Sequence, residues 1–426
     1  MMTSKPHVLV VGGGFAGLET AFSLRYLLGD RVRLTLAADR EDFLFKPNTI
    51  YLPFGADEAR LHIPLPDPLF RRHIAFHQGS VTEIDPYALA VELTDGTRLR
   101  GDFLVLATGA AMRPQEIPGL PEHAQSVWTP TQMRSLGRRF EELKEDLQAG
   151  QRRRVLFLVP PNNKCAGPLY EIALMLDTRL RRAKLRPLVH LTWTTYESGY
   201  IQAFGSRLHQ VVEHEFTARG IEGHTSAVVD KVGDAEVRYA DGSVRPFDLL
   251  VAFPPYVAAV DYSGLPRDDR GFLRTLTVTR QVHGHPQVYA PGDAGDFPVK
   301  QAFLALLQAH AVAEHITTVV DPELLARPRP FVPLSMCVME MLDKATFAQV
   351  PLEETGDPNR PVRVAADAGD HYRVGTSPLW RLGKKAIGLY LPVRFRAGRP
   401  FHSGRPWRAM ELALDGMSRT LATGPG

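Results

Sequence analysis

A strand, a glycine-rich turn and a helix follow one another at the start of the chain, and this order constrains the fold more than any other feature. The apolar strand His7–Val11 runs into a turn that contains Gly12, Gly14 and Gly17. Gly12 permits the tight turn, Gly14 lets a pyrophosphate approach the backbone, and Gly17 lets the helix pack closely on the strand. The pattern predicts a dinucleotide-binding, Rossmann-like unit in an α/β protein.

An acidic residue follows the second strand of this unit, Val32–Leu36. Asp39 lies about 20 residues beyond the glycine turn, where a carboxylate in such folds holds the ribose hydroxyls. A solvated turn residue is the alternative interpretation of Asp39. The ribose contact of Asp39 is therefore a hypothesis, because the position at which the acidic residue is expected is occupied by Ala38.

Two later strands each close on a short turn. The turn residues are Ala107, Thr108 and Gly109 after the first strand, and Gly292 and Asp293 after the second. Together with the glycine turn they resemble the three FAD contacts of the two-dinucleotide-binding-domain flavoproteins. In that family the Asp at the place of Asp293 binds the ribityl chain, so the resemblance implies FAD as the cofactor.

A second strand–helix pattern lies between the two flavin segments. It comprises the strand Val155–Val159, the helix Tyr170–Arg182, the strand Leu188–Trp193 and the helix Ser206–Ala218. This alternation predicts a second Rossmann-like domain. We expect the first part of the FAD-binding domain over 1–115, the second Rossmann-like domain over 116–285, the second part of the FAD-binding domain over 286–330, and a C-terminal region over 331–426.

The first turn of the second domain carries a cysteine instead of glycines. Cys165 follows two prolines and leads into the run Gly167–Glu171. Such a turn cannot offer the backbone cradle that a nicotinamide dinucleotide needs. The other cysteine of the 426-residue chain is Cys337. Two cysteines exclude a disulfide-stapled scaffold, and neither has a metal-ligand partner at suitable spacing, so a metal site is not expected.

The segment from Cys165 to Glu171 and the place of Cys337 are similar to the sulfide:quinone oxidoreductases and to the flavoprotein subunit of flavocytochrome c sulfide dehydrogenase. The resemblance implies that sulfide attacks a Cys165–Cys337 disulfide, or a sulfur chain joining them, and leaves a persulfide and a thiolate. The electrons would pass through FAD to a quinone, with Cys337 on the flavin side. FAD is expected to be noncovalent because no further cysteine is left for a thioether link.

The resemblance implies roles for two more residues. Glu171 matches a functional glutamate and is the candidate general acid or base, and Lys300 matches a lysine beside the flavin pyrimidine. From the residues alone, Glu171 is equally a carboxylate favoured at a helix start, and Lys300 a surface lysine. A buried, small hydrophobic side chain is the alternative interpretation of either cysteine.

Three positions depart from the family pattern. Many of the quinone-linked enzymes carry a third cysteine where this chain has Trp128, and histidines near the places of Gln132 and Gln202. The flavocytochrome-type subunits work with two cysteines. Sulfide oxidation therefore remains the predicted function. The departures leave open which sulfur product is released and how fast the reaction is.

The C-terminal region is basic and apolar. From His371 to Met410 it contains no Asp or Glu but nine Lys or Arg, interleaved with bulky side chains. This composition predicts an amphipathic anchor at an anionic membrane surface. A solvated basic face is the alternative, disfavoured because two Trp and two Phe would stay exposed. Residues expected to line a quinone pocket are Phe347, Trp380, Tyr390 and Phe395.

The remaining expectations concern location and rival functions. We see no signal peptide and no apolar run of about 18 residues, which predicts cytoplasmic synthesis and peripheral, monotopic attachment to the membrane. Nucleic acid binding does not fit a flavin domain, and a homo-oligomer is left open. The rivals are a type II NADH:quinone dehydrogenase, a sulfide dehydrogenase coupled to cytochrome c, and a catalytically silent flavoprotein scaffold.

Overall fold

The first unit of the molecule is a six-stranded sheet built from two separate parts of the sequence. The computed structural model describes residues 5–325, 327–358 and 360–422. The strand order is β20–β21–β9–β1–β2–β5, and all neighbours except β20 and β21 are parallel. The bounds are β20 Gln281–Val282, β21 His285–Tyr289, β9 Phe103–Leu106, β1 His7–Val11, β2 Arg33–Ala38 and β5 Ala75–Gln78.

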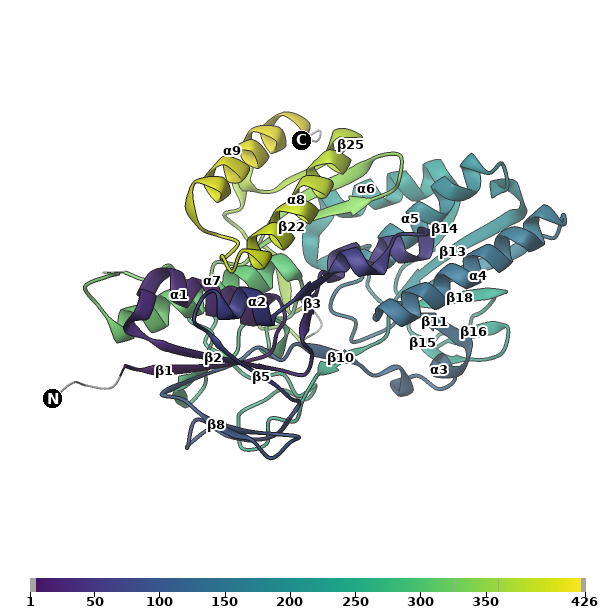
Figure 1. The fold of residues 1–426 in the computed structure, drawn as a ribbon. Helices are drawn as coiled ribbons and strands as arrows, with labels where there is room; N and C mark the ends of the chain where they lie inside the picture. Colours follow the sequence, from purple (N-terminus) through teal and green to yellow (C-terminus); the bar gives the residue numbers. More distant parts are fainter. Residues whose placement is uncertain (1–4, 326, 359, 423–426) are drawn as a thin grey trace.

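Both faces of this sheet are covered, which explains why β1 and β9 are apolar along nearly their whole length. Helices α1 (Phe15–Leu28) and α7 (Ala302–Val320) pack side by side on one face (Figure 1). The other face packs on the three-stranded sheet β6 (Val81–Asp85), β7 (Ala90–Leu93) and β8 (Arg98–Arg100). Strands β7 and β8 of this small sheet form an antiparallel hairpin around Asp95.

Helix α7 corrects one expectation from the sequence. Within the described residues it is the one helix long and apolar enough to cross a membrane, at 19 residues, so an apolar run of that length does exist. Its most apolar window is 61% buried inside the protein. Because its buried side packs against α1 and the sheet, we interpret α7 as a core helix.

The second unit is a five-stranded, all-parallel sheet in the order β11–β18–β12–β13–β14. Its strands are β11 Ala124–Ser126, β18 Leu249–Ala252, β12 Arg153–Val159, β13 Val189–Thr195 and β14 Ile221–His224. Its helices are α4 Pro130–Gln148, α5 Gly167–Arg182 and α6 Gly205–Arg219. Helix α5 begins three residues before the predicted start, because Pro168 is suited to a first helical turn.

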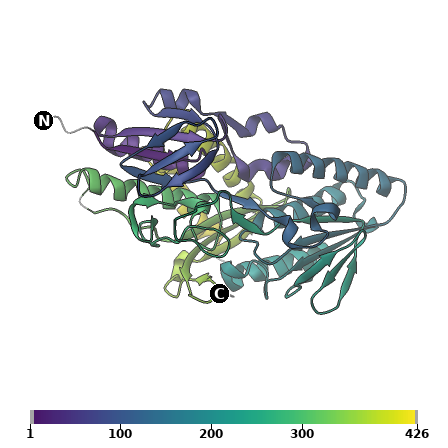
Figure 2. The same ribbon diagram turned by 90° about the horizontal axis from the view of Figure 1, so that it is seen from below.

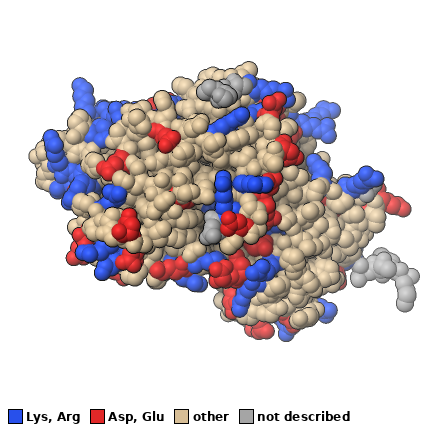
Figure 3. Space-filling model, turned by 180° about the vertical axis from the view of Figure 1, so that it is seen from behind, with Lys and Arg blue, Asp and Glu red and all other residues tan. Residues whose placement is uncertain are grey.

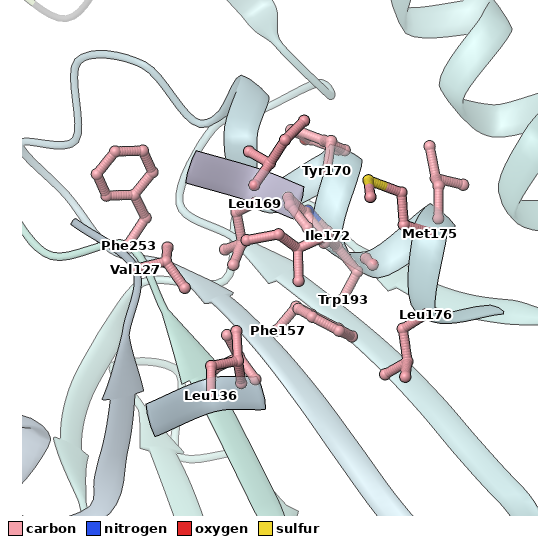
Figure 4. Close-up of a cluster of buried hydrophobic side chains, with 14 of the residues drawn as sticks. Val127, Leu136, Phe157, Leu169, Tyr170, Ile172, Met175, Leu176, Trp193 and Phe253 are labelled. Carbon is pink, nitrogen blue, oxygen red and sulfur yellow. The ribbon is translucent and has the colours of Figure 1, made fainter. Parts of the chain in front are cut away.

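Aromatic side chains fill the interface between α5 and the second sheet. Tyr170 stacks on Trp193 with ring centroids 3.8 Å apart, and Phe157 lies beyond Trp193 at 6.1 Å (Figure 4). All three are buried. This packing fixes the first turn of α5, and with it the loop between β12 and α5 that carries Cys165.

The C-terminal unit lies across both Rossmann-like units. It consists of strands β22 Leu334–Glu340, β23 Ala345–Glu354, β24 Val362–Val364 and β25 Arg373–Ser377, and helices α8 Leu379–Arg396 and α9 Gly404–Leu421. In Figure 1 helix α9 lies at the top of the molecule, and α8 lies below it, above α7 of the first unit. Figure 2, seen from below, places this unit behind the other two. Strand β22 contacts α5 of the second unit and α7 of the first.

The aromatic residues of the basic segment are not exposed, contrary to the expectation from the sequence. Trp380, Phe395 and Phe401 are buried, and Trp407 is half-buried. Trp380 stacks on Phe347 at 4.2 Å, and Phe395 packs on Phe43 at 5.3 Å. The segment is thus a folded pair of helices docked on the body, and its outward surface is made by other side chains.

Candidate active site

One large cavity lies where the three units meet. It has a volume of about 930 Å³ and is lined by the loops that follow β1, β2, β9, β12 and β13, together with β22, α8 and α9. The carboxyl ends of parallel strands are the usual place for ligands in such sheets. A volume in this range accommodates a large organic cofactor.

The glycine turn forms one wall of the cavity. Gly12 has φ +115°, and a Cβ at this position would overlap the carbonyl oxygen of Ala107. A Cβ at Gly17 would overlap the carbonyl oxygen of Gly12, whereas Gly14 faces open space. The first turn of α1 therefore lies directly against the cavity, with unpaired backbone N–H groups that suit a pyrophosphate.

The other predicted cofactor residues lie on the same cavity. Asp39 directly follows β2, and Asp293 begins the turn after β21. The small residues after β9 also line it: Ala107, Thr108 and Gly109. Gly292, with φ +75°, is buried next to Asp293 and packs against Ala16 and Ala305 instead of lining the cavity.

Two lysines bring positive charge to the cavity near Asp293. Lys300 is buried, donates to the carbonyl oxygen of Gly295 and lies 3.8 Å from the centre of the Phe272 ring. Burial lowers the pKa of Lys300 to about 7 and that of Lys46 to about 8, although Asp293 opposes both shifts. Within the described residues neither lysine has a carboxylate at ion-pair distance.

Lys46 was not predicted from the sequence. Its Nζ lies 3.1 Å from the centre of the Trp128 ring, which is the position of the absent third cysteine. A buried cation without an anionic partner is costly. The buried Lys300 and the half-buried Lys46, beside a glycine turn with backbone N–H groups, fit a bound FAD, whose phosphates are negatively charged and whose flavin ring gains negative charge on reduction.

Both cysteines line this cavity as free thiols. Cys165 sits in the loop between β12 and α5, where Asn163 fixes the backbone: its Oδ1 accepts from the Cys165 N–H at 3.0 Å, and its Nδ2 donates to Phe253 O at 2.9 Å. Cys337 lies in the middle of β22, opposite Ala348 of β23. Burial raises the pKa of each thiol to about 12, and a charge on Cys165 adds to the rise for Cys337.

A buried ion cluster connects the cysteines to α8. Lys384 forms an ion pair with Glu171 and donates to Val338 O at 2.9 Å. Arg381 pairs with the fully buried Glu340 at 2.8 Å. The members of the cluster are Glu171, Glu340, Arg381, Lys384 and Tyr51, whose hydroxyl donates to Glu340 at 3.0 Å.

Glu171 holds the centre of this cluster. Besides Lys384 it accepts the Glu340 N–H at 2.9 Å. Burial raises the pKa of Glu171, and the Lys384 ammonium opposes the rise. The negative charge of Glu171 raises the pKa of Cys337, and Lys384 lowers it. The basic helix α8 therefore supplies a positive charge that acts on Cys337, which the sequence did not indicate.

The predicted quinone residues do not line the cavity. Phe347, Trp380 and Phe395 are buried in the packing described above, and Tyr390 is half-buried with its hydroxyl 3.3 Å from Phe401 O. The prediction assumed that aromatic residues of a basic helix face outward, whereas the structure buries them as anchors. Apolar side chains of this region that do line the cavity include Met336, Val338, Met339, Ile387, Leu391, Phe401, Trp407 and Leu414.

Two of the three positions that depart from the family pattern also lie on the cavity. Trp128 packs edge to face on Tyr256 at 5.4 Å, and Gln202 lines the wall formed after β13. Gln132 instead caps α4: it accepts the N–H of Thr129 at 2.9 Å and donates its own N–H to the Thr129 hydroxyl at 3.2 Å. Gln132 is thus a structural residue in this chain.

Comparison with known proteins supports the assignment of the fold. Residues 6–150 match the family described as pyridine nucleotide-disulphide oxidoreductase. A sulfide-quinone reductase of Aquifex aeolicus is 31% identical over 256 residues, which cover 59% of this chain and 58% of that protein. An external alternative NAD(P)H-ubiquinone oxidoreductase of Arabidopsis thaliana is 25% identical over 325 residues, covering 68% of this chain and 55% of that protein.

The similarity of fold extends over the whole chain. The crystal structure of the Aquifex aeolicus sulfide:quinone oxidoreductase superposes with a TM-score of 0.80 at 22% identity and covers 99% of this chain and 100% of that one. The comparisons confirm the predicted α/β fold with Rossmann-like FAD-binding architecture, the resemblance to sulfide-quinone reductases, and FAD as the cofactor. The chain is thus similar in sequence and in fold to flavin-dependent oxidoreductases.

Proposed function

We propose that this FAD-binding relative of the sulfide-quinone reductases oxidises sulfide to sulfane sulfur and delivers the electrons to a membrane quinone. One observation supports the proposal above the others: both cysteines of the chain line the cavity that is also lined by the glycine turn, Lys46 and Lys300. A cysteine pair beside a flavin provides a route for two electrons from a sulfur nucleophile. The loop around Cys165 offers no glycine cradle for a nicotinamide donor.

We assign a role to each residue of the site. Cys165 and Cys337 form the disulfide that sulfide attacks, and Lys384 stabilises the thiolate that leaves at Cys337. When bound, FAD supplies the two-electron acceptor between that thiolate and the quinone. Lys300 and Lys46 stabilise negative charge at the cofactor. Because both cysteines take part in the sulfur chemistry, FAD is held without a covalent link.

Anaerobic titration with sulfide tests the proposal. We expect sulfide to bleach the oxidised flavin band within the mixing time of a manual assay, and a quinone to restore the band. NADH serves as the comparison donor, because rapid bleaching by NADH with no response to sulfide would favour the dehydrogenase rival. Bleaching by sulfide that only cytochrome c reverses would favour the cytochrome-linked rival, and no response to either donor would favour the silent scaffold.

The quinone would enter from the side of α8 and α9. The apolar cavity wall formed by Met336, Val338, Ile387, Leu391 and Leu414 lies between these helices and β22. A quinone ring and its isoprenoid chain need such an apolar passage between the lipid phase and the flavin. The cavity therefore has a polar wall at the glycine turn and an apolar wall toward the C-terminal helices.

The outward face of α8 supports attachment to a membrane surface. Leu382, Leu389 and Val393 are 62%, 70% and 60% exposed, and their spacing places them on one side of the helix. Leu412 of α9 is 73% exposed. Exposed basic residues of the same two helices are Lys385, Arg396, Arg405, Arg408 and Arg419. On the face of the molecule opposite to Figure 1, by contrast, Lys, Arg, Asp and Glu are interspersed (Figure 3).

Substitution of two leucines on this surface should weaken membrane binding. We expect Leu382→Ser together with Leu389→Ser to lower the affinity for vesicles that contain anionic lipid by about 10-fold or more, because each buried leucine contributes roughly 1.5–3 kcal/mol. Co-sedimentation measures the affinity. The matched control is Leu276→Ser with Val278→Ser, two exposed apolar residues of the first unit. Equal binding by wild type and the α8 variant would contradict the proposal.

A further inference from the structure

Three carboxylates that line the cavity act on Cys165: Asp293, which the resemblance assigns to the ribityl chain of FAD, and Glu171 and Glu197, which have different surroundings. Glu171 follows Cys165 on α5, and Glu197 lies two residues beyond the end of β13. Both line the cavity, and the negative charge of each raises the pKa of the Cys165 thiol. Their partners decide which of the two is free to exchange a proton with a substrate.

Glu171 is already neutralised within the protein. Lys384 pairs with it, and the Glu340 N–H donates to it. A carboxylate that holds a buried ammonium cannot take a proton without leaving that ammonium unpaired. Its part is therefore to position Lys384 beside Cys337, not to act as the general base that the resemblance implied.

Glu197 has neutral partners only. Its Oε1 accepts from the Gln202 N–H at 2.9 Å, and its Oε2 accepts from the Thr195 hydroxyl at 3.1 Å. Within the described residues it forms no ion pair. Burial raises the pKa of Glu197 to about 7. The titratable groups on which its charge acts are Tyr170, Tyr196 and Cys165.

The geometry points to Glu197 as the general base that takes the proton of hydrogen sulfide as its sulfur attacks Cys165. The inference rests on the proposed function. In this step the S–H proton goes to the Glu197 carboxylate, a new S–S bond forms between the substrate sulfur and Cys165, and the Cys165–Cys337 bond breaks. The electron pair of that bond stays on Cys337 as a thiolate, and Cys165 carries the persulfide. The quinone, through FAD, later removes the two electrons.

The direction of bond breaking follows from the charges around each sulfur. Lys384 is the cation whose charge lowers the pKa of Cys337, whereas the charges that act most on Cys165 are those of Asp293, Glu171 and Glu197, which raise its pKa. A leaving thiolate is stabilised by an adjacent ammonium. Attack at Cys165 with departure of Cys337 therefore places the developing negative charge beside Lys384.

The test compares Glu197→Gln with wild type in anaerobic stopped-flow reduction of the flavin by sulfide between pH 6 and 9. Near pH 7, where the carboxylate is partly ionised and hydrogen sulfide is still present, we expect a loss of about 100-fold, typical of a missing general base. Toward pH 9 hydrosulfide predominates and needs no base, so the loss should shrink to less than about 10-fold. A purely structural role would lower the rate by the same factor at every pH.

Two further variants complete the test. Glu213→Gln, an exposed glutamate of α6, is the matched control and should keep the wild-type profile. Glu197→Asp keeps a carboxylate and should recover part of the rate with the pH profile of wild type. If the Gln variant does not retain FAD, the Asp variant serves instead, and its loss should be greatest at low pH because its carboxylate is displaced.

The outcomes separate this inference from the proposed function. Wild-type flavin that sulfide does not reduce would overturn the proposed function and the inference with it. Reduction of wild type, with a Glu197→Gln variant that is as fast or is slowed equally at all pH values, would overturn the assignment of Glu197 alone. A loss confined to low pH, absent in the Glu213→Gln control, supports it.

Discussion

Replacing either cysteine by serine is expected to stop the reduction of flavin by sulfide, with rates lower than wild type by more than about 1,000-fold. A serine hydroxyl forms no bond that sulfide can cleave, and it is a far poorer nucleophile than a thiolate. Because the pair acts as a unit, the double variant Cys165→Ser/Cys337→Ser should be no slower than either single variant. Anaerobic stopped-flow absorbance of the flavin measures all three rates.

The control for this experiment lies in the same samples. Dithionite reduces flavin without cysteine, so it should bleach wild type and all three variants equally. The variants should also retain FAD, because no predicted cofactor contact involves either sulfur. Sulfide reduction that persists in either single variant would contradict a cysteine pair as the entry point for electrons, even if the protein still oxidised sulfide by another route.

The parts of the fold that were predicted correctly are those that local sequence specifies. The turn between β1 and α1 requires Gly12 and Gly17, because a side chain at either position would have no room. The spacing of these glycines can be recognised in any chain. The alternation of β12, α5, β13 and α6 follows from hydrophobic periodicity within each segment. Because this periodicity is local to each segment, the predicted boundaries differ little from those of the structure, as at the start of α5.

The parts that were missed depend on contacts between distant residues. Lys384 pairs with Glu171 across 213 positions of sequence, and nothing in the basic run around Lys384 distinguishes it from the exposed Lys385. The same holds for Trp380, which was expected at a pocket but stacks on Phe347. Glu197 was overlooked because its importance lies in the absence of a cationic partner, which sequence does not display.

The second large effect concerns the ion pair between α8 and α5. We expect Lys384→Met to lower the free energy of unfolding of the FAD-loaded protein at pH 8 by about 3–5 kcal/mol, because it leaves Glu171 buried without its counter-charge. The two side chains are only 11% and 12% exposed, so solvent screens the pair little. Urea-induced unfolding followed by tryptophan fluorescence measures the loss. The control is Lys385→Met, one residue along on the exposed side of α8.

The pH dependence identifies Glu171 as the cause. Burial raises the pKa of Glu171 in the folded protein, and without Lys384 nothing of opposite charge limits the rise. A carboxyl whose pKa is higher folded than unfolded binds more protons in the folded state, so stability falls as pH increases through the folded pKa. The Lys384→Met defect should therefore be small near pH 5 and full at pH 8. Adding Glu171→Gln should remove most of the defect and its pH dependence, whereas a loss unchanged by the second substitution would assign the effect to packing of the Lys384 side chain.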